Sequence, residues 1–292
     1  MNRLEVVNLT KKYGEKYALR NFSFSITDGE IVGLLGKSNA GKTTLLNCIA
    51  GNIFPDSGEL VFNGNNLLRN AKDRKAIGIL IEASFVDYLT AYENFQALLY
   101  AAGKTNSGQN RATIEETLSS VDLYNYSEKF VESFPLGVKQ KLGFAQTLLN
   151  GRKMLILDEP FAGLDAGSRT IVKEKIRNIV ETYNIGVLLS EHTLDDVRDI
   201  CNRIVCIENG QKVYDGIISD ETIYYITVSE IYPEMTACLD EYGVQIHQDS
   251  KVIQVIGNEK LSEVLRLVVG FTTVKKIENT QDSLSRFLRE GS

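Results

Sequence analysis

The chain has 292 residues, of which 43% are hydrophobic and 24% charged, so it is long enough for one large domain and a small second one. No apolar stretch approaches the ~18 residues that a membrane-spanning helix needs, and Met1–Val7 has the pattern of a strand, so we expect a cytoplasmic chain without a signal peptide. The formal net charge of −6 argues against a nucleic-acid-binding face, and we predict no nucleic-acid partner.

A phosphate-binding loop is the first strong signal along the chain. The apolar run Ile31–Leu35 predicts a buried strand, and Leu45–Ala50 predicts a helix. Between them stands G-x-x-x-x-G-K-T, and the free N–H groups and dipole at the start of such a helix attract anions. The Lys42 ammonium can reach the outer phosphates of a nucleotide, and the Thr43 hydroxyl can bind Mg²⁺. The predicted nucleotide-binding residues are Gly36, Lys37, Ser38, Asn39, Ala40, Gly41, Lys42, Thr43 and Thr44.

Residues from about 85 to 148 are predicted to be mostly helical. Thr90 can cap a helix that includes Leu89–Phe95, because Glu93 follows three places later as a capping box requires. Further helices are predicted at Ala112–Leu118 and Lys139–Leu149, with a polar loop at Gly103–Gly108.

A pair of carboxylates follows the next buried strand. Met154–Leu157 is apolar throughout, as in a strand of a parallel sheet. Asp158 and Glu159 then emerge at its carboxyl end, where open α/β sheets bind their ligands. We expect Asp158 to hold Mg²⁺ beside Thr43, and Glu159 to act as general base on the attacking water.

The rest of this region alternates between helix and strand. We predict helices near Arg169–Tyr183 and Leu194–Cys201, strands at Val187–Leu189, Ile204–Ile207 and Lys212–Tyr214, and a hairpin turn at Glu208–Gln211.

The pattern changes from about residue 219. The order strand, helix, strand, strand, helix, strand predicts a small ferredoxin-like α+β domain. Its predicted elements are Tyr224–Val228, Met235–Tyr242, Val244–His247, Val252–Val255, Leu261–Val269 and Val274–Ile277, followed by an amphipathic segment at Leu284–Arg289.

Taken together, these motifs resemble the ATP-binding subunit of an ABC transporter. The resemblance implies an α/β P-loop NTPase core at residues 1–217, with a helical subdomain at about 85–148, and a C-terminal α+β accessory domain at 219–292. It also implies that Tyr13 stacks on adenine, that Asp165 lies on a loop reaching across an ATPase dimer, and that His192 contacts the γ-phosphate and orients Glu159. From the residues alone, Tyr13 is equally an ordinary aromatic side chain, and His192 a hydrogen-bonded histidine at a strand end.

Glu82 departs from the family pattern. Most members have glutamine at this place, near Mg²⁺ and the attacking water, whereas glutamate resembles the bacitracin-type and lantibiotic-immunity exporters. An ionised carboxylate adds negative charge and only accepts hydrogen bonds, so it should bind the metal more strongly. The alternative is a solvated loop residue.

A second departure lies in the signature segment Pro135, Leu136, Gly137 and Val138. The family usually has serine in place of Pro135, and that serine lends its hydroxyl to the γ-phosphate on the opposite subunit. Proline lacks both the hydroxyl and the backbone N–H but suits the start of a helix, so we expect a normal helix and a weakened trans contact. Intact residues around Lys42 together with an altered signature segment favour a chain that forms a heterodimer, in which one ATP site is strong and the other weak.

The resemblance implies an ATPase that uses ATP and Mg²⁺ at the inner face of the membrane, together with a transmembrane permease subunit and a second ATPase subunit, and it favours export of a drug or peptide antibiotic. Tyr88, Tyr92 and Phe95 are candidates for the permease-docking surface, or for packing inside the helical subdomain. Two alternatives are a soluble ABC ATPase of translation or DNA repair and a nucleotide-dependent interaction module with little turnover.

Overall fold

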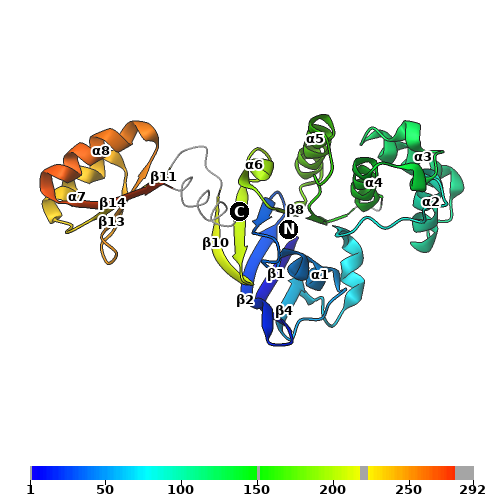
Figure 1. The fold of residues 1–292 in the computed structure, drawn as a ribbon, viewed down its shortest axis with the longest axis horizontal. Helices are drawn as coiled ribbons and strands as arrows, with labels where there is room; N and C mark the ends of the chain where they lie inside the picture. The colour runs from blue at the N-terminus through cyan, green and yellow to red at the C-terminus, as the bar shows by residue number, and fades with distance from the viewer. Residues whose placement is uncertain (1, 150–151, 218–222, 280–292) are drawn as a thin grey trace. The chain divides into compact units, whose positions relative to one another are not determined.

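The computed structural model describes residues 2–149, 152–217 and 223–279, and the chain divides into two compact units, residues 1–218 and 219–292 (Figure 1). The first unit contains two sheets and most of the helices. Its strands are β1 (Arg3–Tyr13), β2 (Lys16–Thr27), β3 (Ile31–Leu35), β4 (Ser57–Phe62), β5 (Asn65–Asn66), β6 (Ile77–Leu80), β7 (Met154–Asp158), β8 (Gly186–Glu191), β9 (Arg203–Glu208) and β10 (Gln211–Ile217). Its helices are α1 (Lys42–Ala50), α2 (Ala91–Ala101), α3 (Ser107–Ser119), α4 (Leu136–Leu148), α5 (Ala166–Tyr183) and α6 (Leu194–Val197), with short 3₁₀ turns at Ala71–Ala76, Tyr124–Tyr126 and Val131–Ser133.

The central sheet has six strands in the order β10-β9-β3-β8-β7-β6. All neighbours are parallel except β10, which pairs antiparallel with β9. Every residue of β3, β7 and β8 is buried, as their apolar sequences predict for strands covered on both faces. Because these strands run parallel, the loops after β3, β7 and β8 meet at one edge of the sheet.

A second, antiparallel sheet has the order β2-β1-β4-β5. One hydrophobic core joins it to α1 and to the central sheet, with buried side chains such as Phe22 from β2, Leu45 from α1 and Ile156 from β7. This core fixes the start of α1 against both sheets, and the start of α1 carries the predicted phosphate-binding loop.

The helical region agrees with the sequence in its capping, differs in where α3 begins, and decides between the two alternatives left open for Phe95. Thr90 and Glu93 form the predicted capping box, each side chain accepting the other's backbone N–H at 3.1 and 2.8 Å. Helix α3 begins inside the predicted polar loop, because the Asn106 side chain accepts the Gln109 N–H and caps it. Phe95 is fully buried and is therefore not part of an exposed surface, whereas Tyr88 is 76% exposed. Figure 1 shows α2, α3 and α4 as one helical group.

The hairpin between β9 and β10 follows the sequence, whereas helix α6 is shorter than predicted. The turn between β9 and β10 places Asn209 and Gly210 at φ 47° and 76°, which is the predicted two-residue hairpin. Helix α6 ends at Val197, short of the predicted Cys201. None of the helices in the described part of the chain is long and apolar enough to span a membrane.

The second unit contains β11 (Ile223–Val228), α7 (Pro233–Leu239), a 3₁₀ turn at Asp240–Tyr242, β12 (Gln245–His247), β13 (Val252–Ile256), α8 (Asn258–Phe271) and β14 (Val274–Asn279). Its strands form one antiparallel sheet in the order β12-β13-β11-β14. A separate core includes Ile226, Met235, Ile253 and Val264. The expected segment Leu284–Arg289 lies outside the described residues.

Candidate functional site

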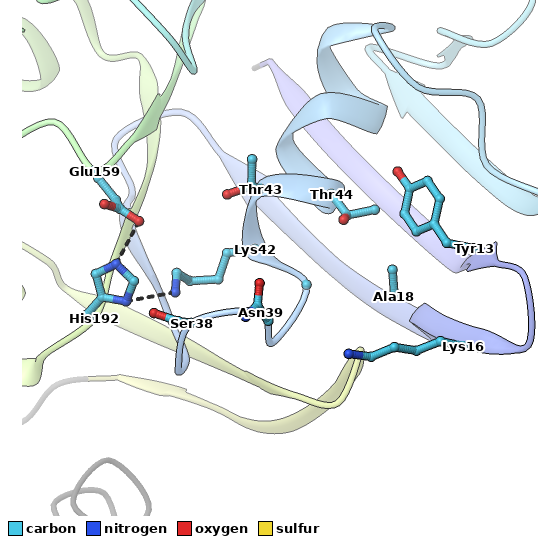
Figure 2. Close-up of a pocket in the computed structure, with 11 residues that line it drawn as sticks. Tyr13, Lys16, Ala18, Ser38, Asn39, Lys42, Thr43, Thr44, Glu159 and His192 are labelled. Carbon is cyan, nitrogen blue, oxygen red and sulfur yellow. Dashed lines mark hydrogen bonds and ion pairs between the residues drawn. The ribbon is translucent and has the colours of Figure 1, made fainter. Parts of the chain in front are cut away.

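A cavity of about 590 Å³ opens between the loop after β3, the ends of β7 and β8, and the β1–β2 hairpin (Figure 2). Figure 2 shows Tyr13 and Thr44 toward one end and Glu159 and His192 toward the other. The lining residues are Tyr13, Lys16, Ala18, Ser38, Asn39, Gly41, Lys42, Thr43, Thr44, Glu159 and His192. Residues from four separate parts of the sequence therefore meet here, and most of them belong to the predicted nucleotide site.

The loop between β3 and α1 has the tight backbone that phosphate binding requires. Asn39 has φ 64°, a left-handed conformation that asparagine tolerates. Gly41 has φ 116° and precedes α1, and a Cβ at this position would collide with the Ala18 carbonyl. Gly36 is equally confined, since a Cβ there would lie 2.5 Å from the Ile207 carbonyl oxygen. Only glycine fits at these two positions, so the loop can hold its N–H groups around an anion.

Lys42 is buried and hydrogen-bonded at the start of α1. Its side chain is 4% exposed, and its Nζ donates to the carbonyl oxygens of Gly36 at 2.6 Å and Lys37 at 3.2 Å. Burial lowers the pKa of Lys42, while the negative charges of Glu159, Asp158 and Glu191 act in the opposite direction. The cavity is thus lined by a buried ammonium group.

A hydrogen-bonded series joins Lys42 to Glu159 through His192 (Figure 2). Lys42 Nζ lies 3.2 Å from His192 Nδ1, and His192 Nε2 lies 2.7 Å from Glu159 Oε1. Because an ammonium only donates, Nδ1 must accept, and a neutral ring then carries its proton on Nε2 and donates it to the carboxylate. The series therefore orients the Glu159 carboxylate, which lines the cavity.

Asp158 lies behind this series, at the end of β7. It is 7% exposed and accepts a hydrogen bond from the Ser190 hydroxyl. Burial raises the pKa of Asp158, whereas hydrogen bonds from Ser190 and Thr43 lower it in part. The Thr43 hydroxyl and the Asp158 carboxylate are thus in contact, and oxygen ligands of this kind suit Mg²⁺.

Several predicted residues lie outside the cavity lining. Gly36, Lys37 and Ala40 belong to the loop but do not line the cavity, and Glu82 is exposed beyond the end of β6. Asp165 caps α5, where its carboxylate accepts the Ser168 N–H at 2.7 Å. The metal role of Glu82 and the cross-dimer role of Asp165 stay predictions.

The signature segment begins α4. Pro135 occupies the N-cap, and its carbonyl accepts the N–H groups of Val138 and Lys139 at 3.0 Å, so the helix starts normally, as predicted. No side-chain hydrogen bond caps this helix, and Leu136 is 70% exposed. Gly137 packs on the Gly163 carbonyl so closely that a Cβ would lie 2.7 Å from its oxygen.

Sequence reasoning missed Lys16, Ala18 and Ser190. Ser190 pairs in register with Asp158 across parallel strands, so aligning the ends of the two buried runs would have found it. Lys16 and Ala18 enter the cavity through the β1–β2 hairpin, and no local motif marks them.

Comparison with known proteins agrees with the predicted resemblance. The family model described as "ABC transporter" matches residues 19–162. The ABC transporter ATP-binding protein YdbJ of Bacillus subtilis strain 168 is 30% identical over 91% of this chain and 87% of its own length. The lantibiotic transport ATP-binding protein SrtF of Streptococcus pyogenes is 33% identical over 76% and 95%. The bacitracin transport ATP-binding protein BcrA of Bacillus licheniformis is 29% identical over 97% and 95%.

Solved structures show the same fold for the first unit. An ATP-binding subunit of an ABC transporter has a TM-score of 0.67 at 27% identity, covering 74% of this chain and 90% of that one. A dimeric bacterial ABC transporter cassette has a TM-score of 0.69 at 24% identity, covering 74% and 99%.

Proposed function

The chain belongs to the ATP-binding subunits of ABC transporters, which are ATPases, and on this basis we propose that it powers the export of a drug or peptide antibiotic. Two relatives that match most of this chain are transport ATP-binding proteins for bacitracin and for a lantibiotic. Glutamate at position 82 supports the same direction, because it resembles that exporter subgroup.

The observation that carries the proposed chemistry is the series from Lys42 through His192 to Glu159 beside the phosphate-binding loop. Lys42 now satisfies its three protons with two loop carbonyls and a ring nitrogen. The outer phosphate oxygens of ATP are better acceptors for a buried ammonium, so nucleotide binding would redirect Lys42 from His192 toward phosphate. His192 would then keep its Nε2–H on Glu159, and its Nδ1 would donate to a γ-phosphate oxygen only when that nitrogen also carries a proton.

Hydrolysis needs a base placed to receive the proton of the attacking water. Glu159 lines the cavity, and the Nε2–H of His192 fixes one of its two carboxylate oxygens. The other oxygen is available to accept a proton from water as the water attacks the γ-phosphorus and the bond to the leaving ADP oxygen breaks. Tyr13 is 53% exposed on the opposite side of the cavity, which supports the proposal that it stacks on the adenine base.

Mg²⁺ fits the residues present. Thr43 and Asp158 offer a hydroxyl and a carboxylate in mutual contact, and Mg²⁺ in nucleotide sites is held by one or two such groups together with phosphates. When bound, the ion would neutralise charge that develops on the phosphates. Glu82 would be a further ligand only if the loop after β6 moves its exposed carboxylate toward the cavity.

The proposed partners are a transmembrane permease subunit and a second ATPase subunit at the inner face of the membrane. We propose residues 1–217 as the ABC ATPase domain and residues 219–292 as an accessory domain of ferredoxin-like fold. The strand order β12-β13-β11-β14 with all pairs antiparallel supports that assignment. Exposed Tyr88 is the better candidate for permease docking, because Phe95 is buried.

A second candidate is the weak-signature half of a heterodimeric ATPase pair. It rests on the N-cap of α4, where Pro135 leaves the helix without a side-chain hydrogen bond and without a hydroxyl for a partner's γ-phosphate. In a homodimer both sites would carry this defect, whereas in a heterodimer only one would.

The test uses the purified full chain. Calorimetry should detect Mg-ATP binding, Lys42→Ala should weaken it at least tenfold, and Glu159→Gln should keep binding but abolish steady-state hydrolysis. Loss of the gene should make cells more sensitive to peptide antibiotics. A Glu159→Gln variant that hydrolyses ATP as fast as the wild-type chain would contradict the assignment of Glu159 as the base. Absence of Mg-ATP binding to the wild-type chain would contradict the proposed function.

A further inference from the structure

Glu191, which the proposed chemistry leaves unused, is a buried carboxylic acid next to the site. It ends β8 directly before His192, and it is 6% exposed. Its Oε1 is shielded from solvent and has no hydrogen-bond partner among the residues that the structure describes. Burial removes the carboxyl group from water at a large cost in free energy, so the presence of glutamate here calls for a reason other than packing.

The hydrogen bond that Glu191 does make is to the loop after Glu159. Its carboxylate accepts the backbone N–H of Phe161. Phe161 is 1% exposed, and its own carbonyl accepts the Leu164 N–H at 3.3 Å, so the residue organises the turn that leads to Asp165 at the start of α5. The carboxylate therefore ties the strand end that carries His192 to the loop that continues from Glu159.

Charged groups face Glu191 from four elements. They are Asp196 on α6, Glu159 after β7, Arg169 on α5 and Lys42 on α1. The hydrogen bonds of the Arg169 guanidinium go to other groups, because it pairs with Asp196 at 2.8 Å and donates to the Leu164 carbonyl at 3.2 Å. Burial, followed by the charge of Asp196, raises the pKa of Glu191 to about 7. Its protonation therefore changes within the range where cells work.

We propose that Glu191 is a positioning residue for ATP hydrolysis, which holds the Phe161 loop and His192 at the spacing that the His192–Glu159 hydrogen bond requires. This inference rests on the proposed roles of His192 and Glu159. The ionised carboxylate accepts the Phe161 N–H more strongly than the neutral acid, and its negative charge makes nearby Glu159 a stronger base. Ionised Glu191 thus favours hydrolysis, and protonated Glu191 loosens the loop.

The first experiment compares pH profiles of kcat between pH 6 and pH 8 for the wild-type chain, Glu191→Gln and Glu191→Leu. Wild-type kcat should rise through pH 7. Glutamine keeps an acceptor without a charge, so its kcat should stay near the wild-type value at pH 6 and lie on the order of tenfold below wild type at pH 8. Leucine removes the acceptor and should be slow at every pH. KM should change little, because Glu191 does not line the cavity.

Glu181→Gln is the matched control, because it removes one charge from an exposed position on α5. It should reproduce the wild-type profile. A Glu191→Gln profile that keeps the wild-type rise would overturn the proposal.

The second experiment does not depend on hydrolysis. The chain has no tryptophan, so Ala162→Trp places a single fluorophore on the exposed position after Phe161. Its emission should change with a midpoint near pH 7, and adding Glu191→Gln should remove that transition. Identical titrations of the two proteins would overturn the inference, even if the lone chain proved inactive as an ATPase.

Discussion

Buried Glu191 should make the ATPase unit less stable as pH rises, and Glu191→Gln should remove that dependence. The unfolded chain releases the proton of this group near the ordinary value of 4.5, whereas the folded chain keeps it until about pH 7. Because the folded-state pKa is raised, the unfolded state ionises first, and stability falls between pH 4.5 and pH 7. At 1.36 kcal/mol for each pKa unit, the full effect above pH 7 amounts to about 3 kcal/mol.

The assay is urea unfolding followed by the emission of Ala162→Trp, which reports on residues 1–218 alone. Between pH 5 and pH 8, the free energy of unfolding of Ala162→Trp should fall by about 2–3 kcal/mol more than that of Ala162→Trp/Glu191→Gln. Equal losses in the two proteins would show that Glu191 titrates at its ordinary pKa in the folded chain. That result would refute the argument from its burial.

Three further predictions concern the loop, the helical region and the signature. Gly41→Ala should weaken Mg-ATP binding at least tenfold in calorimetry, because alanine is strained at φ 116° and its Cβ meets the Ala18 carbonyl; unchanged affinity would mean that the loop relaxes freely. Thr90→Ala should lower the free energy of unfolding by about 1 kcal/mol through loss of the capping box with Glu93, and equal urea midpoints would contradict it. Pro135→Ser should raise the ATPase rate at protein concentrations where the chain self-associates; no change there would show that the trans contact does not limit turnover.

The first half of the site could be predicted from the sequence because it is local. The strand, glycine loop and helix around Lys42 are consecutive, and the constraints on Gly36 and Gly41 follow from the motif itself. Asp158 and Glu159 were predictable for the same reason, since an apolar run that ends in acids marks the carboxyl end of a buried strand.

Local patterns do not show how distant residues meet, and the pairing of His192 with Glu159 was expected only from the family resemblance. The position of His192 between Lys42 and Glu159 depends on the order β3-β8-β7 in the sheet, which brings three strand ends together. Buried Glu191 could not be recognised either, because its neighbours Phe161 and Asp196 are defined only by tertiary packing. Phe95 illustrates the same limit, since an apolar helical residue faces a core or a partner according to how the helices pack.

The backbone of Glu159 shows how these distant contacts serve the chemistry. Glu159 has φ 45°, a left-handed conformation that costs a residue other than glycine about 1–2 kcal/mol. Its N–H donates to the Ser190 carbonyl at 3.2 Å and to the Ser190 hydroxyl at 3.0 Å, and its carbonyl accepts from Gln140 Nε2 at 2.9 Å. Two of these contacts thus come from β8 and the third from α4, the helix that begins at the signature segment. Since both elements hold the same strained residue on either side of its Cα, any shift of α4 against the central sheet would act directly on the orientation of the Glu159 carboxylate.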